Sequence, residues 1–202
     1  MRRLNLAIKR TADIVFSAAG LIVLMPILLI SAILLEIFMP GPLFFKQQRV
    51  GKDGRLFNII KFRSMKVDKA LEAAHDFTRD AERMTPFGKL LRRTKIDELP
   101  QLWNVLVGDM SLVGPRPTVK EQTDKYNDYQ RQRLNMRPGM TGLAQVNGNV
   151  SLTWDERFVY DIEYVNNFSV LLDIKILCKT VLVVIMGEEK FKRVKSAEGA
   201  DK

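Results

Sequence analysis

Two adjacent carboxylates, Asp97 and Glu98, are the side chains of this sequence that most strongly indicate chemistry. They lie in the stretch KIDELPQLWNVLVGDMSLVGPRP, residues 95–117. The other charged residues close to the pair along the chain are Arg92, Arg93, Lys95, Asp109 and Arg116. Carboxylates gathered with arginines, which bind phosphate oxygens in pairs, are typical of a site that handles phosphate.

A helix is expected to start close to Asp97, because Pro100 is tolerated only in a first turn and Gly108 marks the helix end. A helix N-terminus attracts phosphate and favours an ionised carboxylate, so we expect Asp97 to cap this helix and to be an anion at neutral pH. An ionised aspartate can attack phosphorus and form an acyl phosphate. Glu98 could act as a base. Both carboxylates could hold Mg²⁺, which takes one or two of them together with substrate phosphate oxygens.

Arg116 stands between Pro115 and Pro117, so its backbone would lose little entropy when the guanidinium binds phosphate. A plainer interpretation remains open for each of these residues. Taken alone, an Asp-Glu pair is more often a helix cap followed by a solvated acid, and a single arginine more often forms a surface ion pair.

The composition of the 202 residues predicts one domain with a membrane attachment. The net charge of +9 fits nucleic acid, anionic lipid or a phosphorylated substrate, and does not choose among them. A single cysteine, Cys178, and a single histidine, His75, exclude an internal disulfide framework and a zinc-type cluster, and indicate a reducing compartment. The sequence has no glycine-rich phosphate loop of the Walker or dinucleotide kind.

An apolar stretch occupies residues 14–39, with Glu36 as its only charge. It is long enough to cross a bilayer core, which needs about 20 apolar residues. It is too long for a cleavable signal peptide and leads directly into a basic region. Basic residues flank it on both sides, namely Arg2, Arg3, Lys9 and Arg10 before it and Lys46, Arg49, Lys52, Arg55, Lys61 and Arg63 after it.

Positive charge marks the cytoplasmic side of a membrane, and one straight helix cannot place both flanks there. Pro26 lies near the middle of the stretch, where it removes a backbone hydrogen bond and kinks a helix. We therefore predict a re-entrant helix-break-helix that enters and leaves on the cytosolic face. The alternatives are a spanning helix with a tolerated proline and a buried core helix.

The remaining chain predicts an α+β fold that is mainly helical, with interfacial amphipathic helices and a small β-hairpin around a cytosolic catalytic core. The hairpin is expected at residues 43–50 and 56–62. Residues 66–83 are expected to be helical or mobile. Further helices are expected from Thr85-Pro86 and over residues 121–135, 154–166 and 172–186. Residues 1–40 form the membrane part of the single domain, 41–187 the catalytic core, and 188–202 a charged, disordered tail.

Several motifs follow one another along the chain at fixed spacing. They are a basic apolar N-terminus with a mid-segment proline, KFRSM (61–65), KIDELPQLWNVL (95–106), GDMSLVGPRP (108–117), RPGMTGLAQVNG (137–148) and YDIEYV (160–165). In these motifs the sequence resembles the bacterial sugar transferase family of monotopic phosphoglycosyl transferases, over nearly its whole length. One departure is Met25, where some members place a serine before the helix-breaking proline.

The resemblance implies a reaction at the cytosolic face of the bacterial cytoplasmic membrane. A phospho-sugar moves from a UDP-sugar to polyprenyl phosphate, usually undecaprenyl phosphate, and UMP is released. The route is ping-pong, through a covalent phosphosugar on the aspartate of the Asp-Glu pair. Asp97 is then the nucleophile, Glu98 supports a Mg²⁺ site, and Arg116 binds phosphate.

The resemblance also marks weaker candidates. They are Lys61 and Arg63 for lipid phosphate or headgroups, Arg92 for the diphosphate, Arg137 for nucleotide or phosphate, Gln145 for substrate, and Asp161 as a support of the site. Each of these side chains could instead be a solvated or packed residue. A homodimer is compatible with the sequence, and a nucleic-acid partner is not expected because no binding motif is present. A non-catalytic membrane scaffold and a lipid-phosphate hydrolase remain the competing functions.

Overall fold

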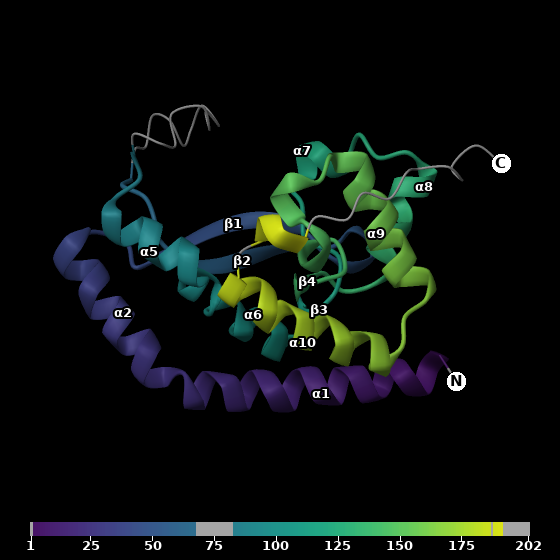
Figure 1. The fold of residues 1–202 in the computed structure, drawn as a ribbon, viewed down its shortest axis with the longest axis horizontal. Coiled ribbons are helices and arrows are strands. Elements are labelled where there is room, and N and C mark those ends of the chain that lie inside the picture. Colours follow the sequence, from purple (N-terminus) through teal and green to yellow (C-terminus); the bar gives the residue numbers. More distant parts are fainter. Residues whose placement is uncertain (1, 68–82, 187, 192–202) are drawn as a thin grey trace.

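A bent pair of helices at the N-terminus runs along one side of the molecule (Figure 1). The computed structural model describes residues 2–67, 83–186 and 188–191. Helix α1 (Arg2–Val23) and helix α2 (Met25–Phe38) meet at a bend of 58°. Pro26 stands in the first turn of α2, where its missing N–H and its ring interrupt a continuous helix. The structure therefore confirms the predicted helix break at Pro26.

No helix among the described residues is by itself both long and apolar enough to cross a membrane. The bent pair formed by Arg3–Val23 and Met25–Phe38 meets the length and composition criteria jointly, as a broken span or a re-entrant loop would. Many large apolar side chains of the two helices are exposed, including Phe16, Ile22, Val23, Ile33, Ile37 and Phe38. An exposed apolar surface of this kind is typical of a membrane or protein contact.

The predicted hairpin is confirmed. Strands β1 (Phe44–Val50) and β2 (Leu56–Phe62) pair antiparallel, with Val50 opposite Leu56 at the turn. A 3₁₀ turn (Lys52–Gly54) joins them, and Asp53 there takes a left-handed φ of 56°. Phe57 and Ile59 of β2 pack into the core against helix α6 (Gln101–Val107).

Helix α5 (Pro86–Thr94) begins as predicted, because the Thr85 hydroxyl accepts a hydrogen bond from the Gly88 N–H at 3.0 Å. The residue after it, Lys95, is left-handed and turns the chain into a 3₁₀ turn, Ile96–Glu98. The prediction that Asp97 caps the next helix is wrong, since α6 starts at Gln101 and Asp97 lies in the preceding turn. Pro100 has no N–H to donate to the Asp97 carbonyl, so the hydrogen-bond series is interrupted between the two.

The single helix predicted over residues 121–135 is also wrong. The structure has helix α7 (Lys120–Thr123), helix α8 (Asp128–Arg131) and a 3₁₀ turn (Gln132–Asn135). Asn127 separates them, because its side chain accepts from the Gln130 N–H in a capping box instead of continuing a helix. Of the segment predicted to be helical or mobile, residues 68–82 lie outside the described residues.

A short parallel pair of strands, β3 (Ser111–Val113) and β4 (Gly139–Thr141), forms the centre of the fold. Two 3₁₀ turns, Gln145–Asn147 and Asn149–Ser151, follow β4. Helix α9 (Trp154–Asn166) has its predicted bounds, and helix α10 (Val170–Met186) starts two residues before the predicted 172. Glu188–Phe191 form a 3₁₀ turn, with Phe191 packed on the core, and residues 192–202 of the expected tail lie outside the described residues.

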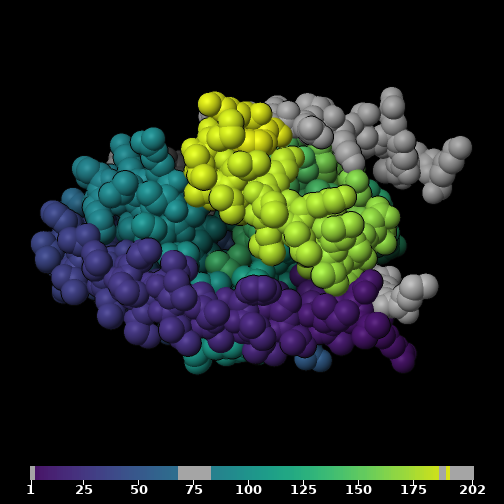
Figure 2. Space-filling view, turned by 60° about the horizontal axis from the view of Figure 1, so that its bottom comes forward, coloured from purple at the N-terminus to yellow at the C-terminus, as the bar shows by residue number. Residues whose placement is uncertain are grey.

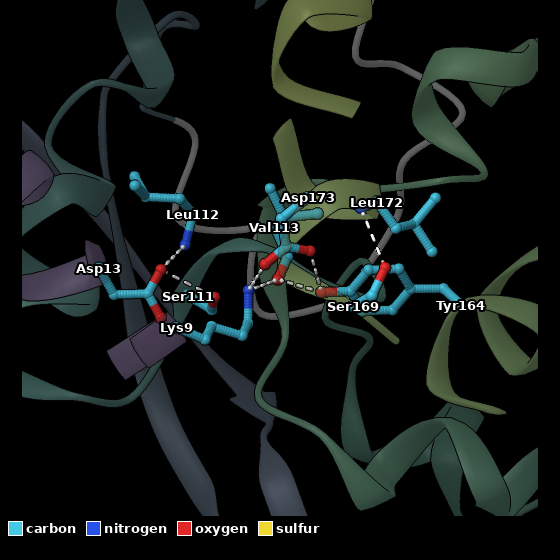
Figure 3. Close-up of polar contacts among 9 residues, drawn as sticks. All are labelled: Lys9, Asp13, Ser111, Leu112, Val113, Tyr164, Ser169, Leu172 and Asp173. Carbon is cyan, nitrogen blue, oxygen red and sulfur yellow. Dashed lines mark hydrogen bonds and ion pairs between the residues drawn. The ribbon is translucent and has the colours of Figure 1, made fainter. Parts of the chain in front are cut away.

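Helix α10 lies beside α1, and Figure 2 shows residues from the two ends of the chain sharing one face of the molecule. Charged side chains of α1 are buried at this junction (Figure 3). Lys9 donates to the Asp173 carboxylate at 2.6 Å and to the Val113 carbonyl at 2.9 Å. Asp13 accepts from the Ser111 hydroxyl and the Leu112 N–H, each at 3.0 Å. The N-terminal helix is thus bound to β3 and α10 by polar contacts.

Candidate active site

Glu98 is held as an anion by two cations from different parts of the fold. Its Oε1 accepts from Lys61 Nζ at 2.6 Å and from Arg116 Nη2 at 3.0 Å. Lys61 comes from β2, and Arg116 comes from the Pro115–Pro117 segment that follows β3. Burial alone would raise the pKa of Glu98, but the charges and hydrogen bonds of Arg116 and Lys61 lower it to about 2. Glu98 is therefore ionised at any physiological pH.

Asp97 is in a different state from its neighbour. The residue is only 7% exposed, and its Oδ1 is a buried atom with no hydrogen-bond partner among the described residues. Burial, followed by the nearby charge of Glu98, raises the pKa of Asp97, while Lys61, Arg92 and Lys95 oppose the rise. This is the reverse of the expectation that a helix N-terminus would stabilise the anion. A carboxylate made more basic in this way is a better nucleophile once it is ionised.

Helix α6 and strand β2 fix the distance between the acidic pair and Lys61. The Asn104 side chain of α6 donates to the Asn58 carbonyl at 2.8 Å and accepts from the Ile60 N–H at 3.0 Å. At the other end of α6, the Arg10 guanidinium donates to the carbonyls of Val105 and Leu106. Sequence reasoning missed the positioning roles of Asn104 and Arg10, because both depend on contacts between distant segments.

A cavity of about 230 Å³ lies next to the acidic pair, with Lys61, Gln101 and Arg116 on its wall. Its other polar or aromatic wall residues are Arg49, Thr118, Gln122, Arg133, Gln145, Asn149, Trp154, Arg157 and Asp161. The cavity is therefore rich in cations and suits an anionic ligand. The structure brings four of the predicted site residues to this wall, namely Lys61, Arg116, Gln145 and Asp161.

Arg133 and Asp161 form a buried ion pair at 2.5 Å in the cavity wall. Arg133 also donates to the Arg116 carbonyl at 2.8 Å and to the Tyr126 hydroxyl at 2.6 Å. Burial raises the pKa of Asp161, and the charge of Arg133 opposes this. The pair thus supports the backbone that carries Arg116. The sequence offered no signal for Arg133, which is one of several arginines in a charged stretch.

The other predicted site residues lie elsewhere. Arg92 donates to the Ser64 hydroxyl at 2.9 Å and is close enough to Asp97 for its charge to act there. Arg63 is buried and donates to the carbonyls of Met39 and Pro40, at the end of α2. Arg137 donates to the Gly108 carbonyl at 2.8 Å and does not line the cavity. Arg63 and Arg137 therefore bind backbone in this structure.

The candidate metal ligands are the two carboxylates alone. Within residues 2–67, 83–186 and 188–191, no group of three or more histidine, cysteine, aspartate or glutamate side chains could hold a metal ion. Two carboxylates suit Mg²⁺ when substrate phosphate oxygens complete its shell. The unpaired Oδ1 of Asp97 is a hard oxygen donor of the required kind. The donor set therefore fits Mg²⁺ in the presence of a phosphate ligand.

Comparison with known proteins gives a consistent family. The profile described as "Bacterial sugar transferase" matches residues 4–187. The galactosyl transferase CpsE of Streptococcus agalactiae serotype III (strain NEM316) is 42% identical over 197 residues, which is 91% of this chain and 43% of CpsE. The uncharacterized sugar transferase EpsL of Bacillus subtilis (strain 168) is 40% identical over 181 residues, covering 90% of this chain and 89% of EpsL.

A third relative, from Aeromonas hydrophila, is named UDP-N-acetylgalactosamine-undecaprenyl-phosphate N-acetylgalactosaminephosphotransferase. It is 40% identical over 187 residues, which is 89% of this chain and 44% of the relative. The chain thus spans less than half the length of this relative and of CpsE, and most of the length of EpsL. Because the family profile matches nearly all of the sequence, the chain belongs to the bacterial sugar transferase family.

Proposed function

We propose that this protein transfers a sugar phosphate from a UDP-sugar to polyprenyl phosphate and releases UMP. The observation that carries the proposal is the contrast within the acidic pair. Asp97 has a buried, unpaired oxygen and a raised pKa, whereas Glu98 is neutralised by Lys61 and Arg116. The name of the Aeromonas relative supports the same donor and acceptor classes.

The first step forms a covalent intermediate. A carboxylate oxygen of Asp97 attacks the phosphorus that bears the sugar, and the bond from this phosphorus to the UMP oxygen breaks. The electron pair of that bond leaves with UMP, and the sugar phosphate remains on Asp97 as an acyl phosphate. Arg116 and Lys61 stand where they can balance charge on the phosphate oxygens, which is the main task of a protein in phosphoryl transfer.

The second step regenerates the carboxylate. A phosphate oxygen of polyprenyl phosphate attacks the same phosphorus, and the bond to Asp97 breaks to give the polyprenyl-diphosphate sugar. When bound by the two carboxylates and substrate oxygens, Mg²⁺ would neutralise further negative charge on the diphosphate. Because the two substrates react in turn, the site never has to hold both bulky anions at once.

The location follows from the acceptor, whose phosphate stays at the membrane surface. We propose that α1 and α2 enter the cytoplasmic membrane as a re-entrant pair, with the catalytic core on the cytosolic face. The exposed apolar side chains of α2 and α10 support this arrangement, among them Ile33, Ile37, Ile174, Val181 and Ile185. The net charge of +9 favours an anionic lipid surface.

The test is a UMP-release assay with the protein in lipid nanodiscs, undecaprenyl phosphate, Mg²⁺ and a panel of UDP-sugars. We expect UMP release and a lipid-linked product with at least one donor, and neither from folded Asp97→Asn. UMP without a lipid-linked product would indicate a hydrolase. No turnover with any donor, in protein shown to be folded, would instead favour a non-catalytic membrane scaffold.

A further inference from the structure

We propose that the cavity beside the acidic pair binds the leaving nucleotide of the donor, and that Gln145 reads the hydrogen-bonding edge of its base. The inference rests on the proposed function, since it assigns one half of the donor to a place in the same site. It starts from the amide of Gln145, which the fold buries without giving it a partner.

Gln145 is only 8% exposed and lines the cavity. Neither its amide nitrogen nor its amide oxygen has a hydrogen-bond partner among the described residues. A buried amide is costly unless something satisfies it, so an unpaired one facing a cavity points to a ligand. The amide oxygen lies against Gly142, where an added Cβ would come within 2.7 Å of it. The same Cβ would come within 2.2 Å of the Gly114 carbonyl oxygen, so Gly142 lets both this backbone and the Gln145 side chain pack closely.

The geometry of the reaction decides which half of the donor enters. Lys61 and Arg116 contact Glu98 and also line the cavity, whereas Asp97 does not line it. A phosphorus held between Asp97 and these two cations therefore has the cavity on its far side. In phosphoryl transfer the attacking and leaving oxygens lie roughly in line, so the group opposite Asp97 is UMP. The sugar oxygen projects sideways from that line.

The charge of the cavity agrees with a nucleotide monophosphate. Its wall carries the cations Arg49, Lys61, Arg116, Arg133 and Arg157, whereas the acids that pair with them are Asp161 on the wall and Glu98 beside it. Burial and then the charge of Arg116 lower the pKa of Arg49, while Glu121 opposes this, as expected where cations lie close together. An anionic phosphate would relieve this crowding.

The lining also suits a planar base. Trp154 lines the cavity, with the Arg157 guanidinium 4.7 Å from its ring centroid. Aromatic rings and arginine planes are the usual stacking partners of unpaired bases. A carboxamide offers one donor and one acceptor side by side, which matches the N–H and C=O groups along the edge of uracil. Gln101, Gln122 and Asn149 also line the cavity, but among these four carboxamides Gln145 alone has both amide atoms buried without a hydrogen-bond partner among the described residues.

The test measures binding separately from turnover. The probe is UMP, titrated by calorimetry into the full-length protein in nanodiscs. We expect Gln145→Met, which keeps the side-chain length, to weaken UMP binding by about tenfold or more. Binding of ribose 5-phosphate, which lacks the base, should be unchanged. Gln132→Met is the matched control, because Gln132 does not line the cavity. Thermal unfolding checks that each variant is folded.

Turnover with several UDP-sugars then separates the base from the sugar. We expect Gln145→Met to raise KM by one common factor for every donor, with kcat and the ranking of sugars unchanged. If Gln145→Met leaves the affinity for UMP unchanged, the inference is overturned. If the substitution also changes the ranking of the sugars, Gln145 contacts the sugar instead of the base. If UMP binds in a Gln145-dependent way but no donor turns over, the nucleotide site stands and the proposed transfer reaction fails.

Discussion

Two neighbouring carboxylates have opposite electrostatic environments, and this difference assigns their roles. Glu98 is paired twice and stays ionised, so it is suited to fixing cations. Asp97 is unpaired at Oδ1 and its pKa is raised by burial and by Glu98, so it is suited to forming a bond. The two carboxylates differ because the fold brings Lys61 and Arg116 within hydrogen-bond distance of Glu98 Oε1, whereas Asp97 Oδ1 has no such partner among the described residues.

If Asp97 is the nucleophile, as we propose, its ionisation sets the acidic limit of activity. Its pKa lies above the ordinary value of 3.8, so kcat falls as pH drops through that raised pKa. Lys61→Met removes a charge that opposes the rise, and we expect the acidic limb of the kcat–pH profile to move to higher pH, with a maximal rate about 100-fold lower. Arg93→Met, on the exposed face of α5, is the control and should leave the limb in place. A limb that moves to lower pH in Lys61→Met contradicts the assignment.

The covalent step can be observed without an acceptor lipid. If Asp97 carries the sugar phosphate, labelled UMP should exchange into the UDP-sugar in the absence of polyprenyl phosphate. We expect Asp97→Asn to abolish this exchange and Glu98→Gln to slow it by about 100-fold or more, because Lys61 and Arg116 lose their common partner. The measurement is the rate at which label enters the donor. Transfer to lipid in the wild type with no exchange at all would exclude the ping-pong route.

At the scale of elements, α1 serves as a structural part of the catalytic core. Lys9 and Asp13 bind β3, and Arg10 binds the C-terminal carbonyls of α6 (Figure 3 shows the first two). Strand β3 leads directly into Arg116, and α6 follows directly after the turn that holds Asp97. The helix that we propose to enter the membrane therefore contacts β3, which precedes Arg116 in the chain, and α6, which follows the turn with Asp97 and Glu98.

The buried pair of Lys9 and Asp173 should make this junction sensitive to a single change. Lys9→Met leaves the Asp173 carboxylate buried without its cation, and we expect a loss of about 3–5 kcal/mol in the free energy of unfolding. Denaturant unfolding in detergent measures it. The control is Lys46→Met at an exposed lysine, for which the change should stay within about 0.5 kcal/mol. Equal effects of the two substitutions would show that the pair does not hold the junction.

The sequence correctly predicted the elements that are determined by residues next to one another in the chain. The Thr85 cap, the hairpin turn at residues 51–54 and the start of α9 each depend on residues next to one another in the chain. The β3–β4 pair was missed because each strand has three residues and its partner is distant. The start of α6 was predicted too early, because Pro100 does stand at the N-terminus of this helix but Asp97 lies in a separate 3₁₀ turn before it.

The same distinction explains the candidate site. Asp97, Glu98 and Arg116 stand in one motif, and the structure brings them together. Arg133 and Asn104 act through contacts across the fold, which no spacing along the chain reveals. Arg63 and Arg137 have the residue type of a phosphate ligand, but each donates to nearby backbone carbonyls instead. The residue type predicted which side chains could bind phosphate. Only the tertiary structure shows which of them already donate their hydrogen bonds to backbone carbonyls.

At the scale of the whole molecule, the bent pair of α1 and α2 carries much of the exposed apolar surface and packs against the elements that hold the candidate site. The bend at Pro26 lets both ends of the pair reach the core, as Figure 1 shows for α1 beside α10 and α2 beside α5. A re-entrant pair and a spanning pair differ in one observable respect, which is the side of the membrane on which the two ends lie.

Cysteine labelling distinguishes the two topologies. In a Cys178→Ser background, we expect Asn5→Cys and Lys46→Cys to react with a membrane-impermeant maleimide from the same, cytosolic side. Asn5 lies in the first turn of α1 and is half-buried, and Lys46 lies in β1 beyond the end of α2 and is exposed. Membrane vesicles of both orientations provide the measurement. Labelling of the two positions from opposite sides would show that the pair spans the bilayer.

The contact between Lys9 and Asp173 also links the order of synthesis to the final fold. The two residues are 164 positions apart, so α1 is synthesised with a cation whose partner has not yet been translated. Because a lysine is costly to bury alone, we expect α1 to complete its contacts at this junction only after Asp173 has been translated. Asp97, Glu98 and Arg116 precede Asp173 in the chain, so the candidate site is fully synthesised before α1 is fixed in place.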